Sequence, residues 1–199
     1  MTFYIFHKNC RVKISFYFFA FLCAAALADR SGIMLCGLLA AMLHESGHIA
    51  LMLLIPGQSP DEIDLTPFGV RIKNSPLSEF GRGNAWVLAA GSGANFLCAA
   101  ATFGFLPRFA AVSLVLGGMN LLPVEGMDGG GILRMLLERR LSGAAADRAL
   151  KAVSWVTLCL MAAAGICVLT ATGYNFTLLG AAGALAAVRV KKAFKKCRR

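Results

Sequence analysis

The sequence predicts an all-α polytopic membrane protein with about six transmembrane helices, a small β-hairpin after the second helix and a broken fourth helix. Hydrophobic residues make up 58% of the 199 residues, and the mean hydropathy is +0.68, well above the balance of a soluble domain. Apolar stretches long enough to cross a hydrocarbon core of about 30 Å recur along the chain. No soluble domain or repeat separates them, so residues 1–199 read as one membrane domain. The predicted spans are 12–28, 31–55, 85–106, 109–138, 152–172 and 174–190.

The first predicted span has the basic start of a signal peptide, with Lys8, Arg11 and Lys13 before or within its first residues. However, Asp29 and Arg30 lead directly into a second apolar stretch. Two apolar stretches joined by so short a turn form a hairpin, which favours a retained anchor over a cleaved signal peptide.

The longest segment outside the predicted spans runs from residue 56 to residue 84. Apolar residues alternate partially on both sides of Thr66-Pro67-Phe68-Gly69, which indicates a short hairpin with Pro67 at an edge or turn. Such an edge could hold a substrate as an added strand, or the segment could be a plain connector on the membrane surface. The candidate substrate-strand residues are Ile63, Leu65, Phe68, Val70 and Ile72.

The basic residues predict the orientation of the chain. With both termini and segment 56–84 in the cytoplasm, the outer loops hold two of the 20 Lys and Arg residues, Arg30 and Arg108, and the inner side holds the other 18. This is a strong positive-inside pattern, and the bacterial cytoplasmic membrane is the expected location. The net charge of +10 and the basic tail 191–199 are therefore interpreted as contacts with anionic lipid rather than with nucleic acid.

The chain has seven cysteines, and none of them forms a Cys-x-x-Cys pair. They lie mostly within the predicted spans or on the cytoplasmic side. We therefore expect small core residues and neither a disulfide framework nor a cysteine metal site.

Residues 44–48, His-Glu-Ser-Gly-His, place three ionisable side chains in a stretch as apolar as a membrane span. Such residues are costly in hydrocarbon, so they favour a functional role. On a helix, His44 and His48 leave the same face about one turn apart and can bind one ion. Glu45 lies beside the first ligand, where it can hold a metal-bound water and accept its proton. The pattern predicts a zinc site with its own base.

A zincin site needs a third protein ligand. The only other histidine is His7, before the first predicted span, so a carboxylate at membrane depth is expected. Glu125 and Asp128 are the candidates, and both lie in segment 119–131, whose Pro123 and glycines must interrupt the fourth span.

The depths of the two motifs agree. At about 1.5 Å per helical residue, His44 and His48 lie about 10 to 16 Å above the cytoplasmic end of their span. The same estimate puts Asp128 about 9 to 16 Å above that face.

On these residues the chain resembles the site-2 proteases, a family of intramembrane zinc metalloproteases. Residues 44–48 match the family's His-Glu-x-x-His motif, and residues 120–129 look like its Asn-Leu-Leu-Pro…Asp-Gly motif. Residues 90–95 resemble the family's Gly-Pro-x-x-Asn segment, with serine in place of the proline. Residues 65–69 look like the strand region of sporulation-type members. The resemblance covers a core of about residues 31–138.

The resemblance implies one Zn²⁺ held by His44, His48 and Asp128, and a zinc metalloendopeptidase of the site-2 protease type. It also implies a membrane-associated regulatory protein as substrate, such as a pro-sigma factor, and a membrane inhibitor as a further partner. No PDZ domain or CBS domain is expected in this chain.

The mechanism expected from these residues is peptide hydrolysis by a zinc-bound water, with Glu45 as the base. Asn95 and Asn120 are candidates for contact with the scissile carbonyl or its oxyanion. Glu125 is expected to face a hydrated cavity rather than to bind the metal. The alternatives are a six-span transporter that does not cut peptides, or an inactive relative that binds membrane peptides.

Overall fold

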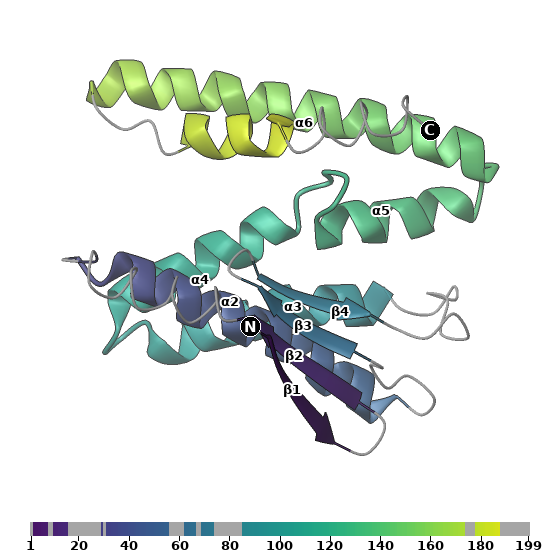
Figure 1. The fold of residues 1–199 in the computed structure, drawn as a ribbon. Coiled ribbons are helices and arrows are strands. Elements are labelled where there is room, and N and C mark those ends of the chain that lie inside the picture. The colour runs from purple at the N-terminus through teal and green to yellow at the C-terminus, as the bar shows by residue number, and fades with distance from the viewer. Residues whose placement is uncertain are drawn as a thin grey trace. The chain divides into compact units, whose positions relative to one another are not determined.

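The computed structural model describes residues 2–7, 10–15, 29, 31–55, 62–66, 69–73, 85–173 and 178–187. The chain divides into two compact units, Met1–Leu121 and Leu122–Arg199. Figure 1 shows the elements of both, and each unit is described by itself below.

The first unit contains a four-stranded sheet in the order β1-β2-β3-β4 (Figure 1). The hairpins β1/β2 and β3/β4 are antiparallel, and β2 runs parallel to β3. Two parallel neighbours need a long crossover, and the chain between β2 and β3 contains helix α2. The fourth strand lies at an edge of the sheet and contacts α2. The strands are β1 Thr2–His7, β2 Cys10–Ser15, β3 Glu62–Thr66 and β4 Gly69–Lys73.

Two of these strands were not predicted from the sequence, and two lie where it indicates a hairpin. The predicted span 12–28 is wrong at its start, because residues 12–15 continue strand β2. Val12 and Ile14 alternate with Arg11 and Lys13, which is the period of a strand and not of a helix. Residues 16–28 lie outside the described part. In the 56–84 segment, β3 and β4 pair from Thr66 opposite Gly69 to Glu62 opposite Lys73.

Helix α2, Ile33–Leu54, is a single apolar helix of 22 residues. The carboxylate of Asp29 accepts hydrogen bonds from the backbone N–H groups of Ser31, Gly32 and Leu35, at 2.8 to 3.1 Å. The bond from Leu35, followed by the other bonds, lowers the pKa of Asp29. These bonds satisfy N–H groups that a helix start leaves without an intrahelical acceptor. At the other end, Ile55 is extended and Pro56 follows, which is where helices usually stop.

Helices α3, Ala85–Thr102, and α4, Pro107–Asn120, pack with α2 and with each other. Small residues allow α2 and α3 to approach closely. A Cβ added at Gly47 would lie 2.7 Å from the Ala90 carbonyl oxygen and 2.9 Å from the Ala94 Cβ. Helix packing through small residues is typical of membrane proteins, where lipid is as apolar as the side chains.

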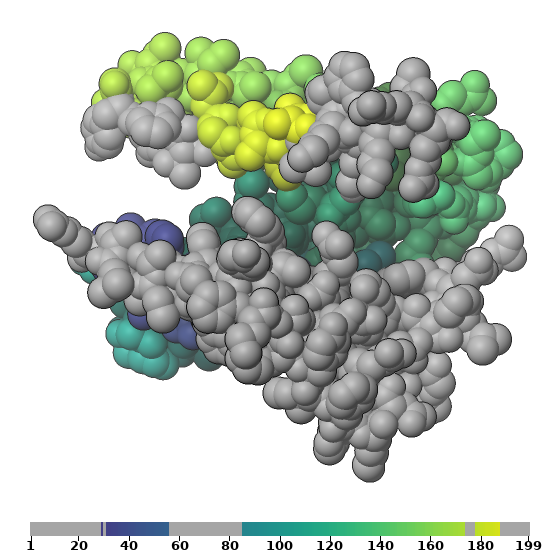
Figure 2. All heavy atoms as spheres, viewed as in Figure 1, coloured from purple at the N-terminus to yellow at the C-terminus, as the bar shows by residue number. Residues whose placement is uncertain are grey.

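The second unit contains α5, Asp128–Glu138, and α6, Gly143–Thr172, which contact each other. An ion pair of 3.2 Å joins Arg134 of α5 to Asp147 of α6. A shorter apolar helix, Leu178–Ala187, follows. It lies along α6, as the yellow and light-green atoms of Figure 2 show, and a Cβ added at Gly165 would lie 2.9 Å from the Leu179 nitrogen.

Three of the described helices are long and apolar enough to cross a membrane: Ile33–Leu54, Ala85–Thr102 and Gly143–Thr172. The long apolar elements are helices, as the sequence predicts, but the described part of the chain does not support a count of six spans. The predicted fourth span, 109–138, is divided into α4 and α5 by residues 121–127. The described helix in the predicted span 174–190 covers residues 178–187.

Candidate metal centre

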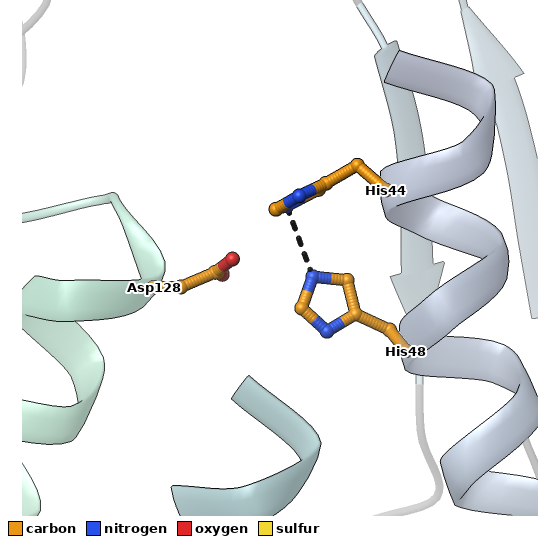
Figure 3. Close-up of side chains that lie close together, drawn as sticks. All are labelled: His44, His48 and Asp128. Carbon is orange, nitrogen blue, oxygen red and sulfur yellow. Dashed lines mark hydrogen bonds between the residues drawn. The ribbon is translucent and has the colours of Figure 1, made fainter. Parts of the chain in front are cut away.

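His44 and His48 lie one turn apart on the face of α2 that packs inward, and they are 5% and 7% exposed. Their rings meet edge to face, with centroids 4.7 Å apart and planes at 88°. The two Nε2 atoms face each other at 3.2 Å (Figure 3). The i, i+4 spacing of the motif therefore brings the Nε2 atoms of the two rings close enough to bind one ion.

The backbone of α3 determines which nitrogen of His48 carries the proton. Nδ1 of His48 lies 2.7 Å from the carbonyl oxygen of Val87. A carbonyl can only accept, so Nδ1 donates its N–H, and the neutral ring keeps its lone pair on Nε2. Metal-binding histidines commonly use their second nitrogen in this way, which orients the ring.

Asn95 of α3 makes the corresponding contact with the other ring. Its Nδ2 lies 3.4 Å from Nδ1 of His44, and its side chain is 0% exposed. The structure thus brings Asn95 to a histidine, whereas the sequence suggested a contact with substrate.

Gly91 closes the site on the side of α3. A Cβ added at this position would clash with Nε2 of His48 and would lie 2.7 Å from Cε1 of that ring and 2.8 Å from Cε1 of His44. Only glycine leaves room for both rings against α3. The sequence pointed to the segment around Gly91 but assigned no role to Gly91 or to Val87. A backbone carbonyl such as that of Val87 leaves no signal in a sequence.

The histidine pair fits a zinc ion. Zn–N bonds of about 2.0 to 2.1 Å at a tetrahedral angle place two ligand nitrogens about 3.3 Å apart. The observed separation of the two Nε2 atoms is 3.2 Å. Two buried imidazoles with converging nitrogens are borderline-soft donors that suit zinc.

Glu45 is half-buried on α2, one residue after His44 and therefore offset around the helix. Ser46 is exposed, and its hydroxyl donates to the Leu43 carbonyl at 2.7 Å. Glu45 is therefore the acidic residue that α2 places beside its histidines.

In the second unit, residues 121–127 lead into Asp128, the first residue of α5, which Figure 3 also draws. Gly126 has φ of 101°, a conformation that favours glycine, and Val124 is 1% exposed. Oδ2 of Asp128 is buried. A carboxylate at the start of a helix is stabilised by the helix dipole. The predicted break in the fourth span thus ends at Asp128, one of the two candidate acidic ligands.

Ser154 of α6 holds this irregular segment. Its Oγ accepts the backbone N–H of Glu125 at 3.0 Å and lies 2.6 Å from the Leu150 carbonyl and 3.2 Å from the Pro123 carbonyl, to which it can donate. Its side chain is 0% exposed. Ser154 was not predicted from the sequence, where its signal is that of a polar residue in the apolar stretch of α6.

The remaining predicted residues are placed as follows. Asn120 is half-buried at the last residue of α4, and Glu125 is half-buried in the 121–127 segment. Ile63, Leu65, Val70 and Ile72 belong to β3 and β4, of which the structure describes the backbone, and Phe68 lies outside the described residues.

Comparison with known proteins finds one family match and one similar fold. Residues 100–164 match Peptidase family M50. The structure is similar to that of the "Site-2 Protease from Methanocaldococcus jannaschii", with a TM-score of 0.55 and 19% sequence identity over 96% of this chain and 91% of that chain. Among curated proteins, none matches the sequence. The structural likeness establishes the fold, and the family match covers the segment that contains Asn120 and Asp128.

Proposed function

We propose that this protein is an intramembrane zinc metalloprotease of the site-2 protease type, which hydrolyses a peptide bond in or near a membrane-associated segment of a regulatory protein. The observation that carries the proposal is the buried histidine pair, whose Nε2 atoms converge at 3.2 Å on a helix apolar enough to span a membrane. The match of residues 100–164 to Peptidase family M50 and the fold likeness to a site-2 protease support it.

Asp128 is the proposed third ligand. Two histidines with one carboxylate are a known catalytic zinc set, and His44, His48 and Asp128 would supply these three ligands. Asp128 also matches the aspartate of the Asn-Leu-Leu-Pro…Asp-Gly motif, which the resemblance implies as a ligand. Glu125 matches no ligand position of that motif.

A zinc ion held by three protein ligands keeps a fourth position for water, lowers the pKa of that water to about 7 and polarises a carbonyl. The chain supplies the proton transfers. Glu45 accepts the proton of the attacking water and then donates it to the leaving amine. Asn120 is proposed to donate its amide N–H to the oxyanion, because it ends α4 just before the segment that leads to Asp128.

The edge strand β4 is the proposed site for the substrate backbone. A substrate helix must unwind before its carbonyl can be attacked, and its backbone groups then need new partners. An edge strand offers them by strand addition. β4 lies at an edge of the sheet and contacts α2, the helix that carries both histidines and Glu45. The residues proposed to contact the substrate strand are Ile63, Leu65, Phe68, Val70 and Ile72.

The proposed setting is the bacterial cytoplasmic membrane, with both termini in the cytoplasm and the site opening to that side, because 18 of the 20 Lys and Arg residues then lie inside. A pro-sigma factor is the proposed substrate and a membrane protein the proposed inhibitor, as the resemblance to sporulation-type members implies.

The test compares wild-type protein with Glu45→Gln in two measurements, zinc content and cleavage of a membrane-associated substrate. The amide keeps the shape of the carboxylate but cannot accept a proton, so we expect cleavage to fall by about 10²-fold or more while zinc stays bound. Near-normal cleavage would remove Glu45 from the base role. A wild-type protein without zinc would refute the metalloprotease and favour a transporter or an inactive peptide-binding protein.

A further inference from the structure

Asn95 presents two hydrogen-bonding atoms in a fully buried place, and only one of them has a partner. Its Nδ2 lies 3.4 Å from Nδ1 of His44, while its Oδ1 is buried and has no hydrogen-bond partner among the described residues. A buried amide oxygen without a donor is unfavourable, because it has lost its hydrogen bonds to water. Among the described residues, the hydrogen-bond partner of this buried amide is therefore His44.

With the nitrogen of the amide toward His44, the hydrogen bonds run in one direction. Asn95 donates to Nδ1 of His44, which requires the His44 proton to be on Nε2. That Nε2–H donates to Nε2 of His48 at 3.2 Å, and Nδ1–H of His48 donates to the Val87 carbonyl at 2.7 Å. Every ring nitrogen is satisfied in this arrangement, but His44 has no lone pair on Nε2 to offer a metal ion.

The two ends of an amide have nearly the same shape, so turning the side chain by 180° needs no extra space. Oδ1 then faces His44 and accepts an N–H from Nδ1. The proton of the neutral ring is now on Nδ1, and the lone pair is on Nε2. The net charge is unchanged, because one proton has moved from one nitrogen of the ring to the other.

We propose that Asn95 is a positioning residue whose amide orientation selects the tautomer of His44. With Nδ2 donating, His44 and His48 share a hydrogen bond. With Oδ1 accepting, both Nε2 lone pairs converge and can bind one zinc ion. The inference rests on the proposed function, because it assigns the state with Nδ1–H to the zinc-bound protein. In that state Oδ1 has a donor, and Nδ2 takes the place that Oδ1 had in the first orientation.

The choice of residue at position 95 makes the inference testable. An amide can donate or accept, a carboxylate can only accept, and leucine of similar size does neither. Asn95→Leu should weaken zinc binding about 10- to 100-fold, the usual cost of losing a partner of a metal-binding histidine. Asn95→Asp should keep the wild-type affinity or exceed it, because it accepts from Nδ1–H. Equal losses in both variants would overturn the proposal.

Ser92→Ala is the matched control. It removes another buried polar atom from α3, one turn before Asn95, and its Oγ makes no hydrogen bond to a histidine among the described residues. Zinc affinity should be unchanged in this variant. A loss equal to that of Asn95→Leu would mean that any polar deletion in α3 disturbs the site, and the specific role of Asn95 would be lost.

A second measurement needs no zinc. The chain has three histidines, so ¹⁵N labelling of the imidazoles can report which nitrogen of His44 carries the proton, with His7 as a reference. Metal-free wild type should show Nε2–H, and metal-free Asn95→Asp should show Nδ1–H. A tautomer that the Asp variant leaves unchanged would refute the role of Asn95 even if zinc binds. If wild type binds no zinc but the tautomer shifts, the proposed function fails and the control by Asn95 stands.

Discussion

The two regions that carry the candidate ligands are built in different ways. His44 and His48 lie on regular helix, and their direction follows from the 3.6-residue period and from partners on α3. Asp128 follows seven residues of irregular backbone, whose course is fixed by a buried hydroxyl and by glycine. The two histidines therefore need only a helix and a closely packed neighbouring helix. The segment before Asp128 also needs a side chain of another helix, Ser154, to hold its backbone in place.

The difference also shows in what each glycine does. Gly91 leaves room for two side chains, the imidazoles of His44 and His48. Gly130 leaves room for backbone, because a Cβ there would clash with the carbonyl of Val124 and lie 2.7 Å from its carbon. A side chain can rotate away from a new Cβ more easily than a backbone carbonyl can move. A substitution at Gly130 should therefore be tolerated less well than one at Gly91.

The largest expected effect is that of Asp128→Asn. The proposed ligand loses its charge but keeps its shape, so zinc affinity should fall by more than the roughly 100-fold that outer partners of a metal site can cost. The matched change is Glu125→Gln, three residues earlier in the same segment, which should leave zinc affinity unchanged. Competition with a chelator measures both. The reverse result would move the third ligand to Glu125.

Gly91→Ala is expected to have the next largest effect, and it probes the helical region. The new Cβ would displace both imidazoles, which should weaken zinc binding about 10- to 100-fold and lower stability by about 1 to 3 kcal/mol through overpacking. Gly93→Ala, two residues later in α3, is the control, because nothing lies within 4 Å of a Cβ there. It should leave zinc affinity unchanged and stabilise the helix by up to about 1 kcal/mol. Equal behaviour of the two variants would show that the rings do not depend on Gly91.

The helical region was the more predictable of the two for a physical reason. His44, Glu45 and His48 follow from spacing along one helix, which the sequence states directly. Asp128 and Glu125 remained alternatives from the residues alone, and the preference for Asp128 came from the family resemblance. Asp128 stays a proposal.

The features missed by sequence reasoning depend on contacts that form only when the elements pack. The role of Val87 comes from a backbone carbonyl of α3 that faces His48, and the role of Ser154 comes from a hydroxyl of α6 that faces residues 123–125. Strand β2 was interpreted as the start of a span, because its apolar residues run into the apolar stretch that follows. The alternation of Val12 and Ile14 with basic residues could have revealed it.

The smallest expected effect is that of Ser154→Ala, which probes the tether. The backbone N–H of Glu125 would lose its acceptor in a partly buried place, which should lower the free energy of unfolding by about 1 kcal/mol. Thr157→Val is the control on the same helix, because Thr157 is only half-buried and its hydroxyl donates to the Val153 carbonyl four residues back, as that of Ser154 donates to Leu150. A surface change of this kind should stay within about 0.5 kcal/mol.

Zinc affinity then separates a tether from a simple packing residue. If Ser154 fixes the segment before Asp128, Ser154→Ala should weaken zinc binding less than Gly91→Ala does, and Ser154→Thr should restore it by returning the hydroxyl. A loss of stability with unchanged zinc affinity would mean that Asp128 reaches its position without the help of Ser154. The position of Asp128 would then not depend on a tether from α6, and the difference between the two ligand-bearing regions would disappear.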